Sequence, residues 1–160
     1  YHPSYLLFPM HTPIRTAVLS IVYGALLLAC NSGEEAVKKS ENEVLAIHDE
    51  VMPKIDDILK LKKQLKQRIT SLDSLKASGS ASATLRTDEE KEQATRLVTD
   101  LAIADSLMMS WMSHYNGDTL SKISSEEALN YLAAQKDQIT DVKKRVTTSI
   151  ERSRQFLGKP

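Results

Sequence analysis

Between residues 34 and 76, an apolar residue recurs at every seventh position of the chain. This row consists of Val37, Val44, Val51, Ile58, Leu65 and Leu72. A second row lies three or four residues further along and consists of Ile47, Ile55, Leu61, Ile69 and Leu75. Spacings of three, four and seven place side chains on one helix face, so the pattern predicts a long amphipathic helix. Pro53 lacks a backbone donor and clashes with the preceding turn, so we expect a kink or a fresh helix start there.

Two later stretches repeat this spacing and predict two more helices. The first apolar row is Ala94, Leu97, Leu101, Ala104, Met108, Trp111 and Tyr115. The second is Leu129, Leu132, Ile139, Val142, Val146 and Ile150. Each stretch follows a capping-box pattern, Thr87 with Glu90 and Ser124 with Glu127. We therefore predict helices at about 34–77, 88–116 and 125–156.

The connections between these helices are short, which favours a compact arrangement. Small residues fill positions 78–83, and Asn116-Gly117 suits the end of a helix. Long helices joined by short loops pack antiparallel, so we predict an all-α, up-down-up three-helix bundle with coiled-coil-like packing over residues 34–157. A single long coiled coil is the alternative, and the two loops argue against it. Only one cysteine is present, so no intrachain disulfide supports the fold.

The first thirty residues differ from the rest of the chain. They carry Arg15 and no acidic residue, whereas all 21 acidic residues follow residue 33. Residues 10–29 have the layout of a secretory signal: a short positive front, the apolar run 17–28, and the small residue Ala29. This run is too short for a transmembrane helix. Residues 1–9 do not fit a signal, and we interpret them as upstream of the true start.

The signal ends in Leu27-Leu28-Ala29-Cys30, which resembles a lipobox. The resemblance implies that Cys30 receives lipid, that the chain is cut before it, and that residues 30–33 form a tether. Several acyl chains would hold the protein firmly in a membrane. An ordinary signal with a free cysteine, or a short anchor, are the alternatives. The charges balance over the whole chain, so we expect no nucleic-acid partner, which would require a basic face.

The predicted hairpins bring methionine, histidine and aromatic side chains to one end of the bundle. If the last two helices fold back tightly, Tyr131 lies level with about residue 110. The candidate cluster is His48, Met52, Met108, Trp111, Met112, His114, Tyr115 and Tyr131. Methionines fill irregular gaps, so an ordinary core is one interpretation. A groove for an apolar ligand or a partner helix is another.

A third interpretation of the cluster is a site for a soft metal. Thioethers and imidazoles bind Cu(I), and the ligands would be His48, Met52, Met112 and His114. No tight His/Met repeat supports such a site. Residues 34–47 extend beyond the first predicted hairpin. They form a stalk, pack on the loop 117–124, or pair with another chain.

The sequence contains none of the motifs we sought for catalysis. The sequence has no glycine-rich phosphate loop, no HExxH and no CxxC, and His48 and His114 lie on helix faces without a recognisable nucleophile motif. The adjacent pairs Asp56-Asp57 and Glu89-Glu90 fit solvated helix-start charge. We therefore expect no enzymatic activity and no cofactor.

Three segments resemble a group of small Bacteroidota lipoproteins of unknown function, often labelled "viral A-type inclusion protein". They are 48–54 (HDEVMPK), 108–115 (MMSWMSHY) and 127–142, which opens with EALNYL. The resemblance covers about residues 44–151 and implies an outer-membrane lipoprotein without a known reaction. Asn31-Ser32-Gly33-Glu34-Glu35 loosely resembles a surface-export signal, so the periplasmic face and the cell surface both remain open. The expected role is structural or protein-interacting, with a ligand- or metal-binding lipoprotein as the alternative.

Overall fold

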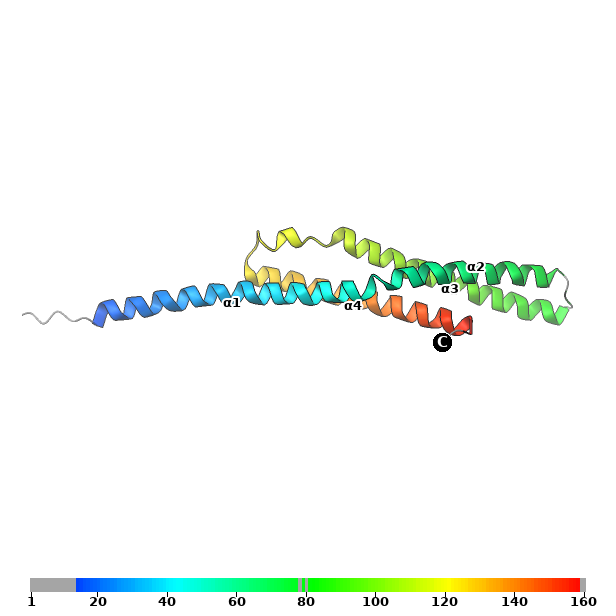
Figure 1. Cartoon of the computed structure of the whole chain (residues 1–160), viewed down its shortest axis with the longest axis horizontal. Helices are drawn as coiled ribbons and strands as arrows, with labels where there is room; N and C mark the ends of the chain where they lie inside the picture. The colour runs from blue at the N-terminus through cyan, green and yellow to red at the C-terminus, as the bar shows by residue number, and fades with distance from the viewer. Residues whose placement is uncertain (1–13, 78, 80, 159–160) are drawn as a thin grey trace, which may run out of the picture.

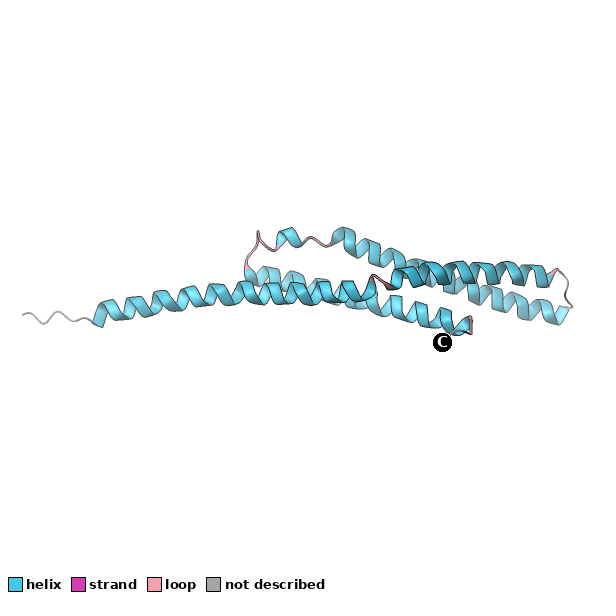
Figure 2. Cartoon of the chain, in the orientation of Figure 1, coloured by secondary structure: helices cyan, strands magenta, loops and turns pink. Residues whose placement is uncertain are grey.

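The structure is a computed structural model that describes residues 14–77, 79 and 81–158, with side chains for 32–77, 79 and 84–158. It contains four α-helices: α1 (Ile14–Val51), α2 (Lys54–Lys76), α3 (Ala81–His114) and α4 (Ser125–Phe156). The short 3-10 helix η1 (Gly117–Thr119) lies between α3 and α4. Figure 1 shows a long rod in which α1 and α2 follow each other end to end, α3 folds back along α2, and α4 turns again to run alongside α1. Figure 2 shows helix and loop throughout the described residues, and no strand.

The rod is an all-α bundle with the predicted up-down-up order. We call α1 and α2 together the first arm. Lys136 pairs with Glu43 and Lys143 with Glu50, at 2.7 and 2.6 Å, so α4 runs parallel to α1. Asp88 and Lys91 on α3 pair in reverse order with Lys76 and Asp73 on α2. α3 therefore runs antiparallel to the first arm, which confirms the predicted bundle.

The predicted interruption at Pro53 is confirmed. α1 ends at Val51 and α2 begins at Lys54. The Met52 amide still donates to the His48 carbonyl at 2.9 Å, and the Ile55 amide donates to the Met52 carbonyl at 3.1 Å. Proline supplies no donor at its own position, so the regular ladder ends and a new helix starts.

Helix boundaries agree with the sequence at α4 and differ elsewhere. The Ser124 hydroxyl accepts the Glu127 amide at 3.3 Å, and the Glu127 carboxylate accepts the Ser124 amide at 3.0 Å, which confirms the second capping box. α3 instead begins at Ala81, so the predicted start at 88 and the cap at Thr87 are corrected. Alanine is the strongest helix former, and residues 81 and 83 extend the helix back into the predicted loop. At its other end α3 stops at His114, two residues before the predicted boundary.

α1 also differs from the sequence prediction, because it begins at Ile14 and passes through positions 30–33. The expected tether is therefore helical backbone. Residues 1–9 and the start of the expected signal, 10–13, lie outside the described residues. Within the described part of the chain, none of the helices combines the length and apolar character that a membrane span requires.

Most residues of the predicted rows are buried, but a few predicted positions are exposed or half-buried and some unpredicted ones are buried. Ala128 and Gln135 are buried on α4, whereas Leu129 is only half-buried. Leu75 of the second row is exposed and lies on α2 in the stretch beyond the end of α4. The continuous core contains Val44, Val51, Ile58, Leu61, Leu65, Ala94, Leu97, Leu101, Ala104, Met108, Trp111, Leu132, Ile139, Val142, Val146 and Ile150.

The rod has two parts of different thickness. Arg154 near the end of α4 pairs with Asp57 near the start of α2, and Phe156 lies beside Gln93 in one groove. Past this level only α2 and α3 continue, and they turn back on each other well beyond the end of α4 (Figure 1). We call residues 65–91 the tip and the three-helix remainder, 32–64 with 92–157, the body.

The segment 34–47 is covered by its own chain. Val44 is fully buried and Val37 packs on the core. A Cβ placed on Gly33 would lie 3.0 Å from the Ser125 hydroxyl, so the start of α4 lies against α1 at this point. Glu41 lies 3.3 Å from a Cβ placed on Gly117, so the segment also meets the connection between α3 and α4. This matches the predicted packing on that loop.

Candidate functional site

The residues that the sequence singled out form a row of rings across three helices. His48 on α1 and Trp111 on α3 have ring centroids 5.7 Å apart. Trp111 stacks on Tyr115 at 5.1 Å and 25°, and Tyr115 lies 6.2 Å from Tyr131 on α4. The row therefore joins all three layers of the body. These four rings come from three separate segments of the sequence, and the tertiary fold brings this part of the predicted cluster together.

Hydrogen bonds fix the two tyrosines of this row. The Tyr115 hydroxyl donates to Glu41 on α1 at 3.3 Å, and the Tyr131 hydroxyl accepts the Asn116 amide at 2.8 Å. Burial raises the pKa of Tyr115 to about 12, and the negative charge of Glu41 adds to this effect. Tyr115 is therefore a neutral donor at any physiological pH, and it ties the end of α3 to α1.

Tyr131 lies further along α3 than the sequence predicted. It contacts Tyr115 and Asn116, whereas a tight hairpin would place it level with about residue 110. The reason is the connection, which contains η1 and further turns and lets α4 start beyond the end of α3. The error of about one turn moves Tyr131 into the ring row.

The methionines and His114 surround this row at different depths. Met108 is fully buried, and Met52 packs on the core. Met109 and Met112 are 43% and 40% exposed. His114 is exposed, and its Nδ1 lies 2.7 Å from the Ser110 carbonyl of its own helix. The predicted cluster is therefore part core and part surface.

The four residues predicted to bind copper do not share one place. His48 contacts Trp111 from α1, and Met52 is one helical turn further along. Met112 is three residues before Tyr115, which contacts α1, so it lies on the same side. His114 instead lines a groove between α3 and α4. Among the side chains described, no three His, Cys, Asp or Glu residues form a group that could hold a metal ion.

Two buried polar atoms beside the ring row have no hydrogen-bond partner. They are the Trp111 indole nitrogen, a donor, and the Gln135 carbonyl oxygen, an acceptor. Trp111 is 6% and Gln135 9% exposed. Trp111 lies four residues before Tyr115, and Gln135 four residues after Tyr131, so antiparallel helices place them at one level. Gln135 was not among the predicted site residues, although its spacing of three from Leu132 and four from Ile139 places it in the buried row.

Trp111 lines a groove of about 540 Å³ between α3 and α4. Trp111 and His114 line it from α3, and Asp137 and Asp141 line it from α4. An unpaired buried donor costs about 1–3 kcal/mol, so such an atom requires an explanation in a stable fold. A bound polar group or a water molecule beside Trp111 would supply one.

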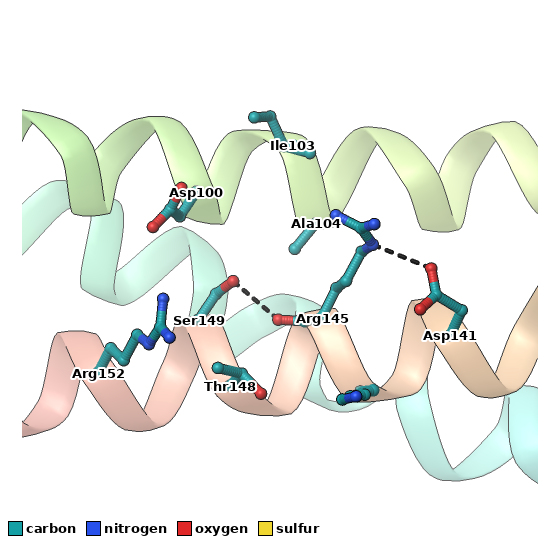
Figure 3. A pocket seen from close by; sticks show the side chains of 9 residues that line it. Asp100, Ile103, Ala104, Asp141, Arg145, Thr148, Ser149 and Arg152 are labelled. Atoms are coloured by element: carbon teal, nitrogen blue, oxygen red, sulfur yellow. Dashed lines mark hydrogen bonds and ion pairs between the residues drawn. The ribbon is translucent and has the colours of Figure 1, made fainter.

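A second groove between α3 and α4 is smaller and charged. Figure 3 shows Asp100 on α3 across from Ser149 and Arg152 on α4, and these residues line, with Ile103, Arg145 and Thr148, a volume of about 310 Å³. The Arg145 guanidinium donates to Asp141 at 2.9 Å. Ser149 donates to the Arg145 carbonyl at 2.7 Å. Charges of both signs line this groove, so it presents no single preference for a ligand.

The α4-facing flank of α1 carries acids that are fully matched. Glu43 and Glu50 accept hydrogen bonds from Lys136 and Lys143. These hydrogen bonds are the main reason that the pKa of each carboxyl lies below its usual value of 4.5. The acids recur every seven residues, as at the edge of a coiled coil. They fix the register of α1 against α4.

Cys30, the predicted lipidation residue, is part of α1, and its side chain lies outside the described ones. Comparison with protein-family models, with curated proteins and with solved structures finds no match to this chain.

Proposed function

We propose that this protein is a lipid-anchored helical rod of the bacterial cell envelope with a structural or protein-interaction role. The observation that carries the proposal is the lipobox-like ending at Cys30 after an apolar run of export-signal length. Lipid on Cys30 would fix one end of the molecule in a membrane. The resemblance to Bacteroidota lipoproteins favours the outer membrane, on its periplasmic face or at the cell surface.

The arrangement of α1 supports this role. Gly33 already lies against Ser125 of α4, so the three-helix body begins three residues after Cys30. The helical backbone continues to Lys76, which places the tip about 65 Å from Gly33 at about 1.5 Å per residue. An anchored rod of this kind holds its side surfaces at fixed heights above the membrane. This is a geometry suited to spacing or docking other proteins, and we propose no catalytic role and no cofactor for it.

The anchor is tested by labelling. The chain is expressed in a bacterium that processes lipoproteins, in the presence of radiolabelled palmitate. We expect label in the wild type and in a Ser32→Ala control, and none in Cys30→Ser. We also expect Cys30→Ser to leave the membrane fraction. A wild-type chain that takes up no palmitate would refute the anchor.

The interaction role is tested by recovery of defined neighbours. Detergent extracts of cells are cross-linked, and the rod is purified through an affinity tag. We expect one envelope protein to be recovered in stoichiometric amount. Residues 34–47 no longer require a second copy to cover Val37 and Val44, which are packed inside the chain. Self-association through this segment remains the other proposal, and light scattering of the full chain tests it.

A ligand-binding lipoprotein is the second candidate, and the unpaired Trp111 and Gln135 atoms favour it. A small molecule with a hydroxyl or carboxamide group can accept from the indole and donate to the amide oxygen. We expect such a ligand to raise the melting temperature of the wild type and not of Gln135→Leu. A titration with Cu(I) run in parallel tests the metal alternative. If neither ligand nor copper changes the melting temperature, this candidate is removed.

A further inference from the structure

Exposed apolar side chains gather along one side of the contact between the first arm and α3. Leu45, Leu59, Met109 and Met112 are between 36% and 53% exposed. Half-buried Met52 lies midway between Leu45 and Leu59, seven residues from each. We call these five residues the methionine patch. Large exposed apolar side chains that cluster in this way mark interaction sites more often than those scattered singly.

Contacts on both sides place the α1 part of the patch. Glu41 contacts Tyr115 and His48 contacts Trp111, so both residues face α3. Leu45 is four residues after Glu41 and three before His48. Residues at these spacings share a helix face, so Leu45 lies at the edge of the contact between α1 and α3.

Helical spacing also places Met109 and Met112 on α3. Asp105 on α3 pairs with Lys62 on α2 at 3.7 Å. Met109 follows Asp105 by four residues, and Met112 precedes Tyr115 by three. Both residues therefore lie on the face of α3 that turns toward the first arm, and not on the face toward α4. The patch is thus one surface formed by two helices.

The acids beside this patch differ from those on the other flank of α1. Asp49 lies between Leu45 and Met52, and Asp56 lies between Met52 and Leu59, at spacings of three and four. Among the described residues, neither carboxylate has a lysine or arginine partner, and Asp49 contacts only the neighbouring His48 ring. On the opposite flank, lysine or arginine pairs with each of Glu43, Glu50 and Asp57.

This contrast identifies the kind of partner. The matched flank is occupied by α4, an amphipathic helix that carries basic residues at its edge. The unmatched flank offers apolar side chains alternating with two carboxylates that have no lysine or arginine partner among the described residues, over 14 residues, or about 21 Å of helix. Methionine side chains adapt to many apolar shapes, which suits a surface that receives a helix.

We propose that the methionine patch binds an amphipathic helix of a partner protein, with large apolar residues on one face and lysine or arginine beside them. A second copy of this chain fits less well. Two copies paired antiparallel about Met52 would bring Asp49 against Asp56, which places like charges together. Beyond Leu59 the row turns basic at Lys63 and Lys66, so the partner's basic residues belong at the Asp49 and Asp56 end.

This inference rests on the proposed interaction role but not on the lipid anchor, so palmitate labelling and the following experiment fail independently. The full chain is kept dispersed in zwitterionic detergent micelles, which does not require lipid on Cys30, and protein-free micelles serve as the blank. The probe is a fluorescent synthetic helix with leucines at positions i, i+3, i+4 and i+7 and lysines elsewhere. A leucine–glutamate helix of the same pattern and a scrambled leucine–lysine peptide are the peptide controls.

Binding is measured by fluorescence anisotropy and by the emission of Trp111, the only tryptophan in the chain. We expect the leucine–lysine helix to bind and to shift this emission. Met109→Gln with Met112→Gln should weaken binding at least about tenfold, or about 1.4 kcal/mol. Asp49→Asn with Asp56→Asn should weaken it less and reduce its salt dependence. Ile103 is similarly exposed but lines the charged groove between α3 and α4, so Ile103→Gln should bind the leucine–lysine helix as the wild type does.

Circular dichroism of each variant excludes loss of fold as the cause. Three results would overturn the proposal. The leucine–glutamate or scrambled peptide binds as tightly as the probe. Ile103→Gln loses as much affinity as the double methionine variant. The full chain alone forms a dimer that the double methionine variant abolishes, which would assign the patch to a second copy.

Discussion

The body and the tip share α2 and α3, and they differ in what the third helix adds. In the body, α4 closes the third side and buries large residues such as Met108, Leu132 and Ile139 completely. In the tip, the buried row is reduced to Leu65 and Leu72, and Leu85 is 65% exposed. Two helices enclose only a narrow row of side chains, so the third helix decides how much of an apolar residue leaves water.

The tip relies on charge where the body relies on burial. Three pairs cross between its helices: Lys76 with Asp88 at 2.7 Å, Lys91 with Asp73 at 2.5 Å, and Arg68 with Glu90 at 2.5 Å. These groups are between 31% and 50% exposed, so each pair contributes little to stability. Their value is in register, because a shifted hairpin would bring like charges together. The tip is therefore aligned by charge, whereas the body is stabilised by its core.

Core truncation gives the largest expected difference between the two parts. Leu132→Ala in the body should reduce the free energy of unfolding by about 3 kcal/mol, because three helices prevent the cavity from closing. Leu72→Ala in the tip should cost about 2 kcal/mol, because two helices can relax toward each other. Urea denaturation of both variants measures the difference. Equal losses would mean that the third helix adds nothing to packing at Leu132.

Alanine at a helix cap in the body and at a helix interior in the tip should change the free energy of unfolding by amounts that differ by up to about 1 kcal/mol. Ser124→Ala removes both hydrogen bonds of the capping box at the start of α4, so it should destabilise the body by about 1 kcal/mol. Thr87→Ala lies inside α3 in the tip, where alanine is the better helix former, and it should change stability by less than about 0.5 kcal/mol. Thermal unfolding compares the two. A larger loss for Thr87→Ala would restore the helix start predicted from the sequence.

Salt should separate the two parts by a smaller amount. Raising ionic strength screens exposed charges, so hydrogen exchange should accelerate at the amides of 65–76 in about 1 M salt relative to about 0.05 M. Amides of 139–150 in the body should change little. Lys91→Gln should already exchange faster at low salt, with a loss of about 0.5 kcal/mol, and respond less to added salt. Uniform acceleration along the chain would contradict a tip aligned by charge.

Lowering the pH should reduce the stability of the body by the smallest amount, through the ion pairs between α1 and α4. The pKa values of Glu43 and Glu50 are lowered in the fold, mainly by hydrogen bonds from Lys136 and Lys143. This contribution is complete above the unfolded pKa of 4.5 and is lost as the pH falls below it through the lowered folded values. We expect stability, followed by circular dichroism from about pH 6 to about pH 2, to decline less in Lys136→Gln with Lys143→Gln. An unchanged slope in that variant would show that the pairs do not contribute.

Most of the architecture was predictable because it follows from periodicity. The seven-residue row from Val37 to Leu72 fixed the core face of the first arm, and the Ser124–Glu127 box fixed the start of α4. The start of α3 was not predictable in the same way. Thr87 and Glu90 have the spacing of a cap, but Glu90 instead pairs across the hairpin with Arg68. A local pattern does not reveal that a distant arginine will use one of its members.

The candidate site was predicted as a set of residues and not as an arrangement. The sequence brought His48, Trp111, Tyr115 and Tyr131 to one end of the bundle, but it placed Tyr131 about a turn away from its contact. It did not separate His114 from His48 and Met52. It also gave no reason to single out Gln135 or the carboxylates Asp49 and Asp56, because pairing depends on which helix lies alongside.

The sequence by itself determined that residues 34–157 form amphipathic helices in an up-down-up bundle, because side-chain spacing and helix ends are local properties of the chain. Only the tertiary structure decided the register of α4, the division into body and tip, and the unmatched flank beside the methionine patch. These depend on the length and shape of the connection 115–124, which sets where α4 starts and therefore which surfaces it covers. The same heptad rows with a tighter connection would leave a different face of α1 exposed.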